Sequence, residues 1–488
     1  MIKRPAGKTI NLLITLSLFL VLFNSGALAQ EKRIDSLRND FKLFRNLLTN
    51  DYPSLYRYSS TSSMDSLLDC KYNLIGAGTT NLEFYKLLKS VLSKVKDGHL
   101  YCSLPPELEK YREEKGKFFP LHLYFSGDRA YVTESFGSSI PAGAELISIN
   151  KQSINSIREQ AFDYLPADGV IKTKKYRILN DYFYFYYNLL YGERPYFNVK
   201  FKLAGSKAVK EVRIEAKLEK DVVKKEIDEA KPLQLIIKPN GVAILTIKTF
   251  NRSVLATAGL EFPEFLEKSF EEINRKKIRK VILDLRGNGG GRDTYGMLLY
   301  SYLTNRKFRY YSRLETVTSK LPYEQFESKS SSFNDLNESM LLPDGSGRFE
   351  LKDNAHLGLQ FIQPAETYYS GRIWFLIDGL SFSTTAEFCA IASENRRGEF
   401  IGEETGGACG GNTSGGEFEI VLPATKISVS AGCVEYKMSV HQKRLLAGGV
   451  MPDYQVVPGI NDIINKKDVQ LNYALKVAGL IYKDSIIW

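Results

Sequence analysis

Two segments in the C-terminal half of the chain combine residue types that could do chemistry at a tight turn. In the first, the apolar run 281–285 leads into a glycine-rich turn at 287–291. Consecutive glycines let the backbone bring its N–H groups close to a bound phosphate or to an oxyanion. The dinucleotide fingerprint fails because Arg292 takes the place of its third glycine, and no P-loop sequence occurs in the chain. The pattern therefore favours an oxyanion hole.

The second segment is a turn rich in serine and threonine. The apolar run 373–377 is followed by Asp378-Gly379, residues 381–385 read Ser-Phe-Ser-Thr-Thr, and a helical pattern comes next. A serine at the N-terminus of a helix is exposed, and the unpaired N–H groups there stabilise a developing anion. The alternative is that these hydroxyl groups simply cap the helix, which the local pattern taken alone favours.

Two further segments bear on this choice. Residues 401–407 read Ile-Gly-Glu-Glu-Thr-Gly-Gly, and residues 449–453 read Gly-Val-Met-Pro-Asp. Together with residues 283–291 and the serine turn leading into Ala-Glu-Phe at 386–388, they resemble the tail-specific (C-terminal-processing) serine peptidase family in order and in spacing. The resemblance implies a serine-type peptidase with a mixed α/β catalytic domain.

The resemblance also implies roles for single residues at the two turns. Ser383 becomes the nucleophile. The oxyanion hole is formed by Gly289 or Gly290 together with the N–H that follows Ser383, which belongs to Thr384. A serine hydroxyl is a weak nucleophile at neutral pH and needs an adjacent base, so a base must be found elsewhere in the chain.

The family contains two catalytic styles, which differ in that base. One branch pairs the serine with a downstream lysine, but residues 406–409 read Gly-Gly-Ala-Cys at the corresponding place. The other branch, of the tricorn-core and retinoid-binding-protein type, uses a histidine from the N-terminal helical region. Residues 95–99 read Val-Lys-Asp-Gly-His and resemble the Asp-x-His segment of that branch. The resemblance therefore implies that His99 is the general base for Ser383.

Two departures from that branch leave the group that orients His99 open. Gly98 stands where the branch has a serine, and Leu-Ala-Gly at 446–448 stands where it has a glutamate. Asp97, Glu435 or a backbone carbonyl group could orient the imidazole ring instead.

The elements that must position these residues follow from the spacing of apolar side chains. From residue 31 to about 110, apolar residues recur at steps of three and four, which predicts helices. From Phe118 the period changes to two, which predicts strands, and residues 141–165 resemble the strand, turn and helix of a PDZ domain. Beyond about residue 219, short apolar runs alternate with helical patterns, as in an α/β or α+β sheet.

The chain is therefore predicted to be a multidomain protein of mixed α+β and α/β class. The predicted parts are a signal peptide at 1–29, an N-terminal helical region at 30–114, a PDZ-like β-rich domain at 115–218, and a tail-specific-protease-like catalytic domain of mixed α/β structure at 219–488. The aromatic run 182–187 is expected to pack against the neighbouring domain, and the polar, serine-rich residues 314–360 are expected to form a surface insertion.

The N-terminus has the three parts of a secretory signal peptide. Lys3, Arg4 and Lys8 precede the apolar run 10–23, and Ala-Leu-Ala at 27–29 offers small residues for cleavage after Ala29. A retained membrane anchor is the alternative, but the apolar run is short for a span of roughly 20 residues. The mature protein is therefore expected to be exported, periplasmic or extracellular, with no stable membrane span after signal cleavage.

Charge, cysteine and histidine patterns give little support to other classes of site. The formal charge of +10 is dispersed, and its densest stretch, residues 172–177, is interpreted as a solvated surface and not as a nucleic-acid site. The five cysteines contain no C-x-x-C, although Cys409 and Cys433 could pair in an oxidising compartment. The four histidines have no metal-binding spacing, so no metal and no cofactor are expected.

Three functions remain, in decreasing order of support. The first is a serine endopeptidase that cuts exported polypeptides at or near their C-termini, with the PDZ-like domain adding an extended tail as a strand. The second is a catalytically weak or inactive binding protein on the same fold. The third is a hydrolase of non-peptide acyl groups, which is disfavoured because no G-x-S-x-G surrounds Ser383.

Overall fold

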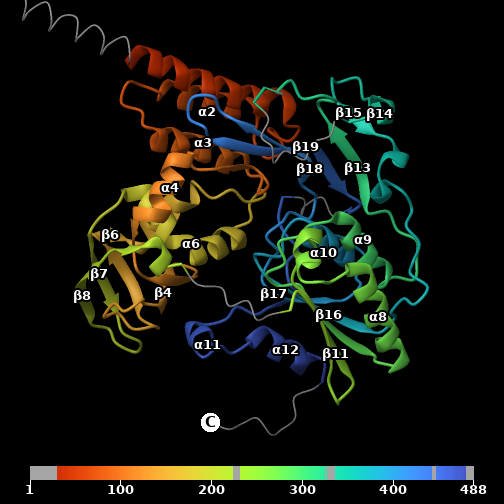
Figure 1. Cartoon of the computed structure of the whole chain (residues 1–488). Coiled ribbons are helices and arrows are strands. Elements are labelled where there is room, and N and C mark those ends of the chain that lie inside the picture. Colours follow the sequence, from red (N-terminus) through yellow and green to blue (C-terminus); the bar gives the residue numbers. More distant parts are fainter. Residues whose placement is uncertain (1–29, 224–230, 324, 327–335, 442–446, 480–488) are drawn as a thin grey trace, which may run out of the picture.

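The computed structural model describes residues 30–223, 231–323, 325–326, 336–441 and 447–479 (Figure 1). The predicted signal peptide at 1–29 lies outside this part of the chain. Within it, no helix combines the length and the apolar character that crossing a membrane requires.

Helices form the N-terminal region, as the spacing of its apolar residues predicts. Residues 30–46 are helical, and the following elements are η1 (Leu47–Asp51), α2 (Thr61–Asn73), α3 (Asn81–Val95) and α4 (Pro106–Lys115). Helix α3 begins with a capping box, in which the side chains of Thr80 and Glu83 each accept the other residue's backbone N–H. It ends where Lys96 takes a left-handed conformation with φ 64°, which turns the chain into Asp97-Gly98-His99.

An antiparallel sheet with two helices occupies the middle of the chain. Its strand order is β3-β4-β5-β7-β8, and β6 pairs with β5. The elements are β2 (Lys117–Phe118), β3 (His122–Ser126), β4 (Arg129–Glu134), β5 (Glu145–Ile149), β6 (Gln152–Ser153), α5 (Ile154–Phe162), α6 (Thr173–Tyr191), β7 (Tyr196–Lys202), β8 (Val209–Glu215), β9 (Lys217–Leu218) and η2 (Glu219–Asp221). Figure 1 shows this sheet on one side of the molecule, with α6 on the side facing the C-terminal half.

The aromatic run 182–187 lies within α6 and packs against its own region and against the N-terminal region. Phe183 and Tyr187 contact Phe119 in edge-to-face and tilted ring pairs, while Tyr186 lies 5.7 Å from the ammonium group of Lys89 on α3. The run therefore makes the expected contact with the neighbouring region as well as contacts within its own. Whether residues 115–218 form a PDZ domain remains a prediction.

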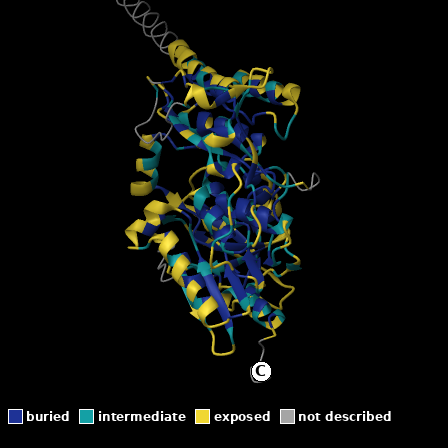
Figure 2. Ribbon diagram, turned by 90° about the vertical axis from the view of Figure 1, so that its right-hand side faces the viewer, coloured by how far each residue is buried: buried dark blue, intermediate teal, exposed yellow. Residues whose placement is uncertain are grey.

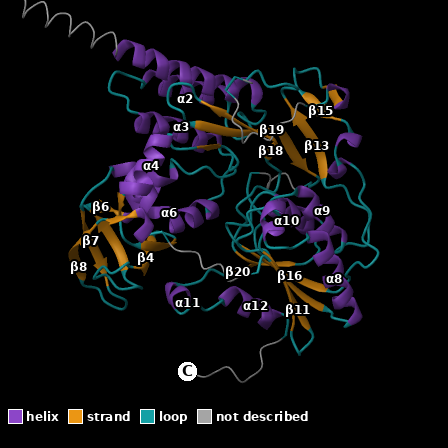
Figure 3. Cartoon of the chain, viewed as in Figure 1, coloured by secondary structure: helices purple, strands orange, loops and turns teal. Residues whose placement is uncertain are grey.

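A mostly parallel sheet forms the centre of the C-terminal half (Figure 3). Its order is β10-β11-β12-β16-β17-β20, and only β10 runs antiparallel to its neighbour. The strands are β10 (Leu233–Ile237), β11 (Val242–Ile247), β12 (Lys280–Asp284), β16 (Arg372–Ile377), β17 (Glu399–Gly402) and β20 (Tyr454–Gln455). The helices are α7 (Arg252–Thr257), α8 (Phe262–Arg275), α9 (Asp293–Ser301), α10 (Thr384–Glu394), α11 (Ile460–Ile464) and α12 (Val469–Val477).

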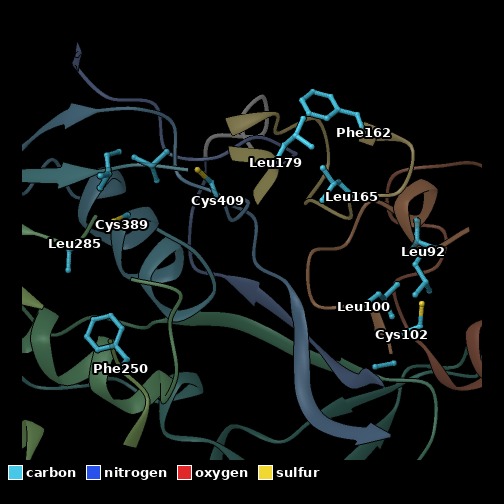
Figure 4. Close-up of a cluster of buried hydrophobic side chains, with 14 of the residues drawn as sticks. Leu92, Leu100, Cys102, Phe162, Leu165, Leu179, Phe250, Leu285, Cys389 and Cys409 are labelled. Carbon is cyan, nitrogen blue, oxygen red and sulfur yellow. The ribbon is translucent and has the colours of Figure 1, made fainter. Parts of the chain in front are cut away.

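Both faces of this sheet are buried, which explains why its strands are continuous apolar runs. On one face, Ile282, Trp374 and Ile401 pack with Ala474 of α12. The other face belongs to a large core that also contains Leu92, Leu165 and Leu179 from the N-terminal half, as well as Leu285 and Cys389 (Figure 4). Figure 2 shows exposed residues mainly on the outer surfaces of the helices and in the loops around this interior.

A second sheet contains part of residues 314–360, which were expected to form a surface insertion. Its order is β1-β19-β13-β15-β14, with β18 paired to β19. The elements are β1 (Tyr101–Cys102), β13 (Tyr311–Thr316), η3 (Glu338–Met340), β14 (Leu341–Pro343), β15 (Phe349–Leu351), η4 (Asp353–Ala355), η5 (Leu357–Leu359), β18 (Thr413–Val421) and β19 (Ser428–Met438). Leu314, Leu341 and Leu351 are buried. The expectation that residues 314–360 form a surface insertion is therefore wrong for β13, β14 and β15, which pair within this sheet and bury these three leucines.

Candidate active site

The glycine turn and the serine turn meet at one edge of the parallel sheet. Strands β12 and β16 are parallel neighbours, with Asp284 opposite Leu376, so their carboxyl ends lie side by side. The carboxylate of Asp378 after β16 accepts the N–H groups of Gly287 and Ser381, at 3.0 and 3.1 Å. One acidic side chain thus joins both turns.

Asn288 holds the glycine turn against the serine turn. It is fully buried, and its backbone carbonyl accepts the N–H of Phe382 at 3.1 Å. Its side-chain oxygen accepts the N–H of Gly290 at 2.9 Å, and its amide group donates to the carbonyl of Ile247 on β11 at 3.1 Å. The polar residue inside the glycine run therefore fixes the geometry of the turn.

The oxyanion-hole prediction needs a correction at Gly290. Because its N–H already donates to Asn288, Gly290 is not a free donor. Its contribution is close approach: a Cβ atom there would lie 2.7 Å from Cβ of Ser383, and its φ of 98° also requires glycine. The N–H groups of Gly289 and Thr384 donate to no acceptor among the described residues.

Ser383 is not a helix cap in the ordinary sense. It precedes α10, but its side chain makes no capping hydrogen bond, and its backbone lies at φ 55°, ψ −129°. Such a conformation costs a non-glycine residue about 1–3 kcal/mol and is found where a site requires it. Ser381, in contrast, donates its hydroxyl to the carbonyl of Leu285 at 3.0 Å. The capping alternative is therefore wrong for Ser383.

His99 reaches Ser383 from the other half of the chain. Its Nε2 lies 3.1 Å from the hydroxyl oxygen of Ser383, across 284 residues of sequence. Its ring stacks on Phe382 with centroids 4.4 Å apart. After His99, the chain enters β1, which pairs with β19. The turn that ends α3 and the pairing of β1 together place the imidazole ring.

Asp97 is the acidic group beside the far nitrogen of His99. One of its oxygens lies 3.3 Å from Nδ1 of His99 and accepts the His99 backbone N–H at 2.8 Å. Tyr52 donates its hydroxyl to the other oxygen at 2.6 Å. Burial by itself would raise the pKa of Asp97, but His99 and Tyr52 outweigh burial and lower it to about 2. Asp97 is therefore a carboxylate at neutral pH.

Glu435, the other acid that could have oriented His99, forms ion pairs with arginines instead. Its carboxylate lies 3.0 Å from Arg348 and 3.8 Å from Arg57. Of the alternatives that the sequence left open, only Asp97 is a carboxylate in contact with the His99 side chain. Its oxygen sits at ion-pair distance from Nδ1 without ideal hydrogen-bond geometry.

The interpretation of residues 172–177 as a solvated surface is wrong for Lys174. Its side chain is buried, donates to the carbonyl of Gly98 at 3.2 Å and lies 3.0 Å from the centroid of the Phe382 ring. Burial lowers the pKa of Lys174 to about 8, although Asp168 and Asp97 oppose that shift. The basic run was misjudged because one face of α6 turns inward.

Lys174 also accounts for the glycine that departs from the family pattern. A Cβ atom on Gly98 would lie 2.4 Å from Nζ of Lys174 and 2.9 Å from the Phe382 ring. A serine has no room there while Lys174 fills the space. The carboxylate of Asp168 accepts the N–H of Gly98 at 2.7 Å and the N–H of Ala408 at 3.0 Å. Asp168 therefore connects the base segment with the segment that follows the Gly-Gly at 406–407.

Three of these groups are spaced as metal ligands could be. Ligand atoms of Asp97, His99 and Asp168 lie within 4.8 Å of one another. Each already has protein partners: His99 faces Ser383, Asp97 accepts from Tyr52, and Asp168 accepts two backbone N–H groups. This donor set fits a hydrogen-bond network around the imidazole better than a cation site.

A second buried acid, Glu387, lies one helical turn after Ser383. Its oxygens accept from Asn412 at 2.7 Å and from the hydroxyl of Tyr311 at 2.9 Å. Burial, reinforced by the nearby carboxylate of Asp293, raises the pKa of Glu387 to about 7. Glu387 belongs to the Ala-Glu-Phe motif at 386–388, from which no role was predicted for it. The available signal was an acid surrounded by apolar residues in the first turns of α10.

The segments 401–407 and 449–453 help to hold the serine turn in place. Gly406 donates its N–H to the carbonyl of Ser381 at 2.9 Å, and a Cβ atom on Gly407 would lie 2.6 Å from Ala386. Val450 in turn donates its N–H to the hydroxyl of Thr405 at 2.8 Å. These glycines and the Gly-Val-Met-Pro-Asp segment therefore act as packing elements around Ser383.

All five cysteines are free thiols, so the possible pairing of Cys409 with Cys433 is absent. Burial raises the pKa of Cys409 to about 12, and the pKa of Cys433 is raised in the same way to about 12. Figure 4 shows Cys389 and Cys409 within the buried cluster of apolar side chains. They act as small apolar residues in this fold.

Comparison with known proteins agrees with the fold and the family. Residues 241–456 match peptidase family S41 and form a domain of that family, which confirms the resemblance drawn from the sequence. Residues 241–456 thus form a serine-type peptidase domain. No curated protein matches it.

Solved structures of CPAF share the fold over most of the chain. Mature CPAF is 15% identical, with a TM-score of 0.62 over 91% of this chain and 96% of that one. Mature CPAF complexed with lactacystin is 14% identical, with a TM-score of 0.61 over 91% of this chain and 98% of that one. The photosystem II D1 C-terminal processing protease is 13% identical, with a TM-score of 0.39 over 89% of this chain and 96% of that one.

Proposed function

We propose that the chain hydrolyses peptide bonds with Ser383 as the nucleophile and His99 as the general base. The 3.1 Å contact between Nε2 of His99 and the hydroxyl oxygen of Ser383 carries this proposal. A neutral imidazole at that distance can take the hydroxyl proton as the oxygen attacks a substrate carbonyl. The strained backbone of Ser383 is consistent with such a role.

The remaining groups would act on the charges that form during attack. The N–H groups of Gly289 and Thr384 are free to donate to the oxyanion, and the latter belongs to the first residue of α10. Asp97 stays ionised and would stabilise the imidazolium through Nδ1. His99 would then return the proton to the leaving amine, and a water molecule would repeat the cycle on the acyl-enzyme.

We further propose that the substrates are exported polypeptides, cut at or near their C-termini. The support is the signal-peptide pattern at 1–29 and the PDZ-like pattern within 115–218, both taken from the sequence. N-terminal sequencing of exported protein from the native host tests the first. A mature chain should begin at Gln30, and an exported chain that begins at Met1 would contradict export by cleavage.

A fluorophosphonate that labels activated serines tests the mechanism. The wild-type protein should be labelled, Ser383→Ala should not be, and His99→Ala should be labelled far more slowly. Ser393→Ala, at the other end of α10, and His441→Ala, with an 88% exposed side chain, are the matched controls and should label normally. Labelling of folded Ser383→Ala at the wild-type rate would refute the assignment, whereas an unlabelled wild-type protein would favour the binding-protein alternative.

A further inference from the structure

Lys174 is a buried base to which the proposed mechanism gives no role. It belongs to the first turn of α6, and its side chain is buried. It forms no ion pair with any residue that the structure describes, although Asp97 and Asp168 lie close enough to oppose the lowering of its pKa by burial. Burying an ammonium group outside an ion pair is costly, so a lysine kept in such a place is a candidate for a functional role.

The ammonium group of Lys174 contacts the base segment and the serine turn at once. Its Nζ donates to the carbonyl oxygen of Gly98 at 3.2 Å and lies 3.0 Å from the centroid of the Phe382 ring. Gly98 directly precedes His99, and Phe382 directly precedes Ser383. One buried side chain therefore joins the two segments that carry the proposed base and nucleophile, although those two residues are 284 positions apart in sequence.

The Phe382 ring connects this cation with the imidazole ring of His99. The two rings stack with centroids 4.4 Å apart and an angle of 29° between their planes. A cation that is desolvated over an aromatic face attracts that face more strongly than a cation in water does. A ring that Lys174 holds in place therefore supports one face of the imidazole.

The backbone of the base segment is held by the same arrangement. Asp168 accepts the N–H of Gly98 at 2.7 Å, while Lys174 donates to the carbonyl group of the same residue. Burial and the neighbouring Asp97 raise the pKa of Asp168, and the charge of Lys174 opposes that rise. Both backbone polar groups of Gly98 are thus bound by buried side chains, and Lys174 helps to keep Asp168 ionised.

The helix that carries Lys174 is itself fixed against the C-terminal half. Arg177, on the next turn of α6, forms an ion pair with Glu403. A Cβ atom on Gly379 would lie 2.6 Å from the backbone of Thr173, so the turn after β16 packs closely on the start of α6. These contacts define where the ammonium group of Lys174 lies relative to the site.

We propose that Lys174 is a positioning residue for the general base. Its ammonium group holds the Gly98 carbonyl and the Phe382 ring, and so keeps Nε2 of His99 at the hydroxyl group of Ser383. Lys174 is not itself the base, since no hydrogen bond joins it to Ser383, and the structure describes both residues. The assignment rests on the proposed peptidase function, because it adds a residue to that mechanism.

Steady-state cleavage of a peptide by Lys174→Met measures the effect on the reaction. Methionine keeps the length and the apolar part of the side chain but loses the donor and the charge. With His99 held less firmly, kcat should fall about tenfold or more while KM changes by less than about twofold. If Lys174→Met does not fold, Lys174→Gln replaces it; the amide keeps a donor for Gly98 but loses the charge, and kcat should fall about threefold.

Lys175→Met is the matched control and should keep the wild-type kcat. Burial also lowers the pKa of Lys175 to about 8, but its ammonium group donates to the carbonyl of Phe162 at 3.0 Å and not to the base segment. An equal loss of kcat in both variants would contradict the proposal. A kcat of the Lys174 variant equal to that of the wild type would overturn it, as would a rise in KM alone.

A double-mutant cycle with Gly98→Ala tests whether the effect depends on the contact with Gly98. A Cβ atom on Gly98 would lie 2.4 Å from Nζ of Lys174 and 2.9 Å from the Phe382 ring, so Gly98→Ala should displace both groups and lower kcat about tenfold. Lys174→Ala removes the ammonium group from that space. In the Lys174→Ala background, Gly98→Ala should therefore cost less than about threefold, whereas losses that multiply would overturn the proposed coupling.

The ring signals of His99 in magnetic resonance spectra give a readout that needs no catalysis. The chain has only four histidines, so isotope-labelled histidine resolves each ring, and the signals missing from His99→Ala identify His99. Lys174→Met should shift and broaden these signals, while Lys175→Met should leave them in place. Unchanged His99 signals in Lys174→Met would overturn the positioning role even if kcat fell.

Failure of this inference is distinguishable from failure of the proposed function. A wild-type protein that neither cleaves peptides nor reacts with a fluorophosphonate would overturn the peptidase function, while the His99 signals would still show whether Lys174 holds the ring. Wild-type cleavage together with an unaffected Lys174→Met variant would overturn the positioning role alone.

Discussion

Two buried carboxyl groups lie near the Ser383 turn, and their surroundings shift their pKa values in opposite directions. Asp97 accepts three hydrogen bonds or close contacts from His99 and Tyr52, and its pKa is lowered to about 2. Glu387 accepts from the neutral groups of Tyr311 and Asn412 beside another acid, and its pKa is raised to about 7.

The difference shows that burial alone does not decide the charge of an acid. Burial raises the pKa in both cases, and only the partners differ. The Asp97 side contains the acid Asp168 together with the base Lys174, whereas the Glu387 side contains the acid Asp293. Asp97 is thus kept ready to stabilise a cation, while Glu387 changes its charge near neutral pH.

The largest effect is expected when Asp97 loses its charge but keeps its shape. Asp97→Asn should lower kcat by about 10³-fold with little change in KM, because an amide cannot stabilise the imidazolium. Steady-state kinetics on folded protein provide the measurement. Asp163→Asn, in which an exposed Asp loses its ion pair with Lys94, is the matched control. A kcat within threefold of wild type would show that Asp97 does not support the base.

Lys174 is expected to make stability rise with pH in the alkaline range. Its pKa is about 8 in the folded protein, compared with 10.5 for an exposed lysine. Between these values the unfolded chain binds more protons, so the free energy of unfolding rises with pH, by roughly 3 kcal/mol for this group. Lys174→Met should reduce this rise, and the similarly shifted Lys175 should retain part of it.

Denaturant unfolding at several values between pH 8 and 10.5 measures this rise. Lys94→Met is the control, because its side chain is 52% exposed and its slope should match the wild type. An unchanged slope in Lys174→Met would mean that Lys174 keeps its ordinary pKa and stays protonated in the folded protein across this range.

Glu387 is expected to make stability fall with pH in the acidic range. The folded protein binds more protons than the unfolded chain between pH 4.5 and about 7, so the free energy of unfolding decreases as pH rises through that window. Glu387→Gln should remove the decrease, which amounts to roughly 3 kcal/mol at most. The same unfolding series from pH 4 to 8 measures it, with the exposed Glu264→Gln as control. A wild-type decrease that persists in Glu387→Gln would assign it to other groups.

Much of the fold and part of the candidate site could be predicted from the sequence. The apolar strands before the two turns could be predicted because a run of apolar residues is a local signal. Strands β12 and β16 lie where the apolar runs 281–285 and 373–377 predict them. The pairing of Ser383 with His99 was inferred only through family resemblance, because no local rule connects residues so far apart. The family is confirmed, and their roles remain a proposal.

The surroundings of His99 could not be predicted, because they depend on tertiary contacts. Lys174 lies in a basic run that would suit a solvated surface, and only the orientation of α6 buries it. Gly98 looked like a lost partner, but the structure shows that Lys174 occupies the space a side chain would need. Gly290 was expected to donate to the oxyanion, and only the position of the Asn288 side chain shows that its N–H is taken.

The smallest effects should come from removing one tyrosine hydroxyl at each acid. Tyr52→Phe deletes a donor to ionised Asp97, so the pKa of Asp97 should move up toward 3.8, the value of a free Asp. Asp97 contributes stability above pH 3.8 that is lost as pH falls toward 2, and this contribution should shrink by roughly 1–2 kcal/mol in the variant.

Tyr311→Phe makes the equivalent change at Glu387, whose pKa should rise above 7. The decrease in stability that begins at pH 4.5 should then continue to higher pH, by a similar roughly 1–2 kcal/mol, because the charged form has lost a donor. The two Tyr→Phe changes therefore push both acids in the same direction but act on stability in different pH ranges. Unfolding of both variants from pH 2 to 9 measures this directly. If the two profiles shifted in the same pH range, Asp97 and Glu387 would not differ in pKa as their surroundings imply.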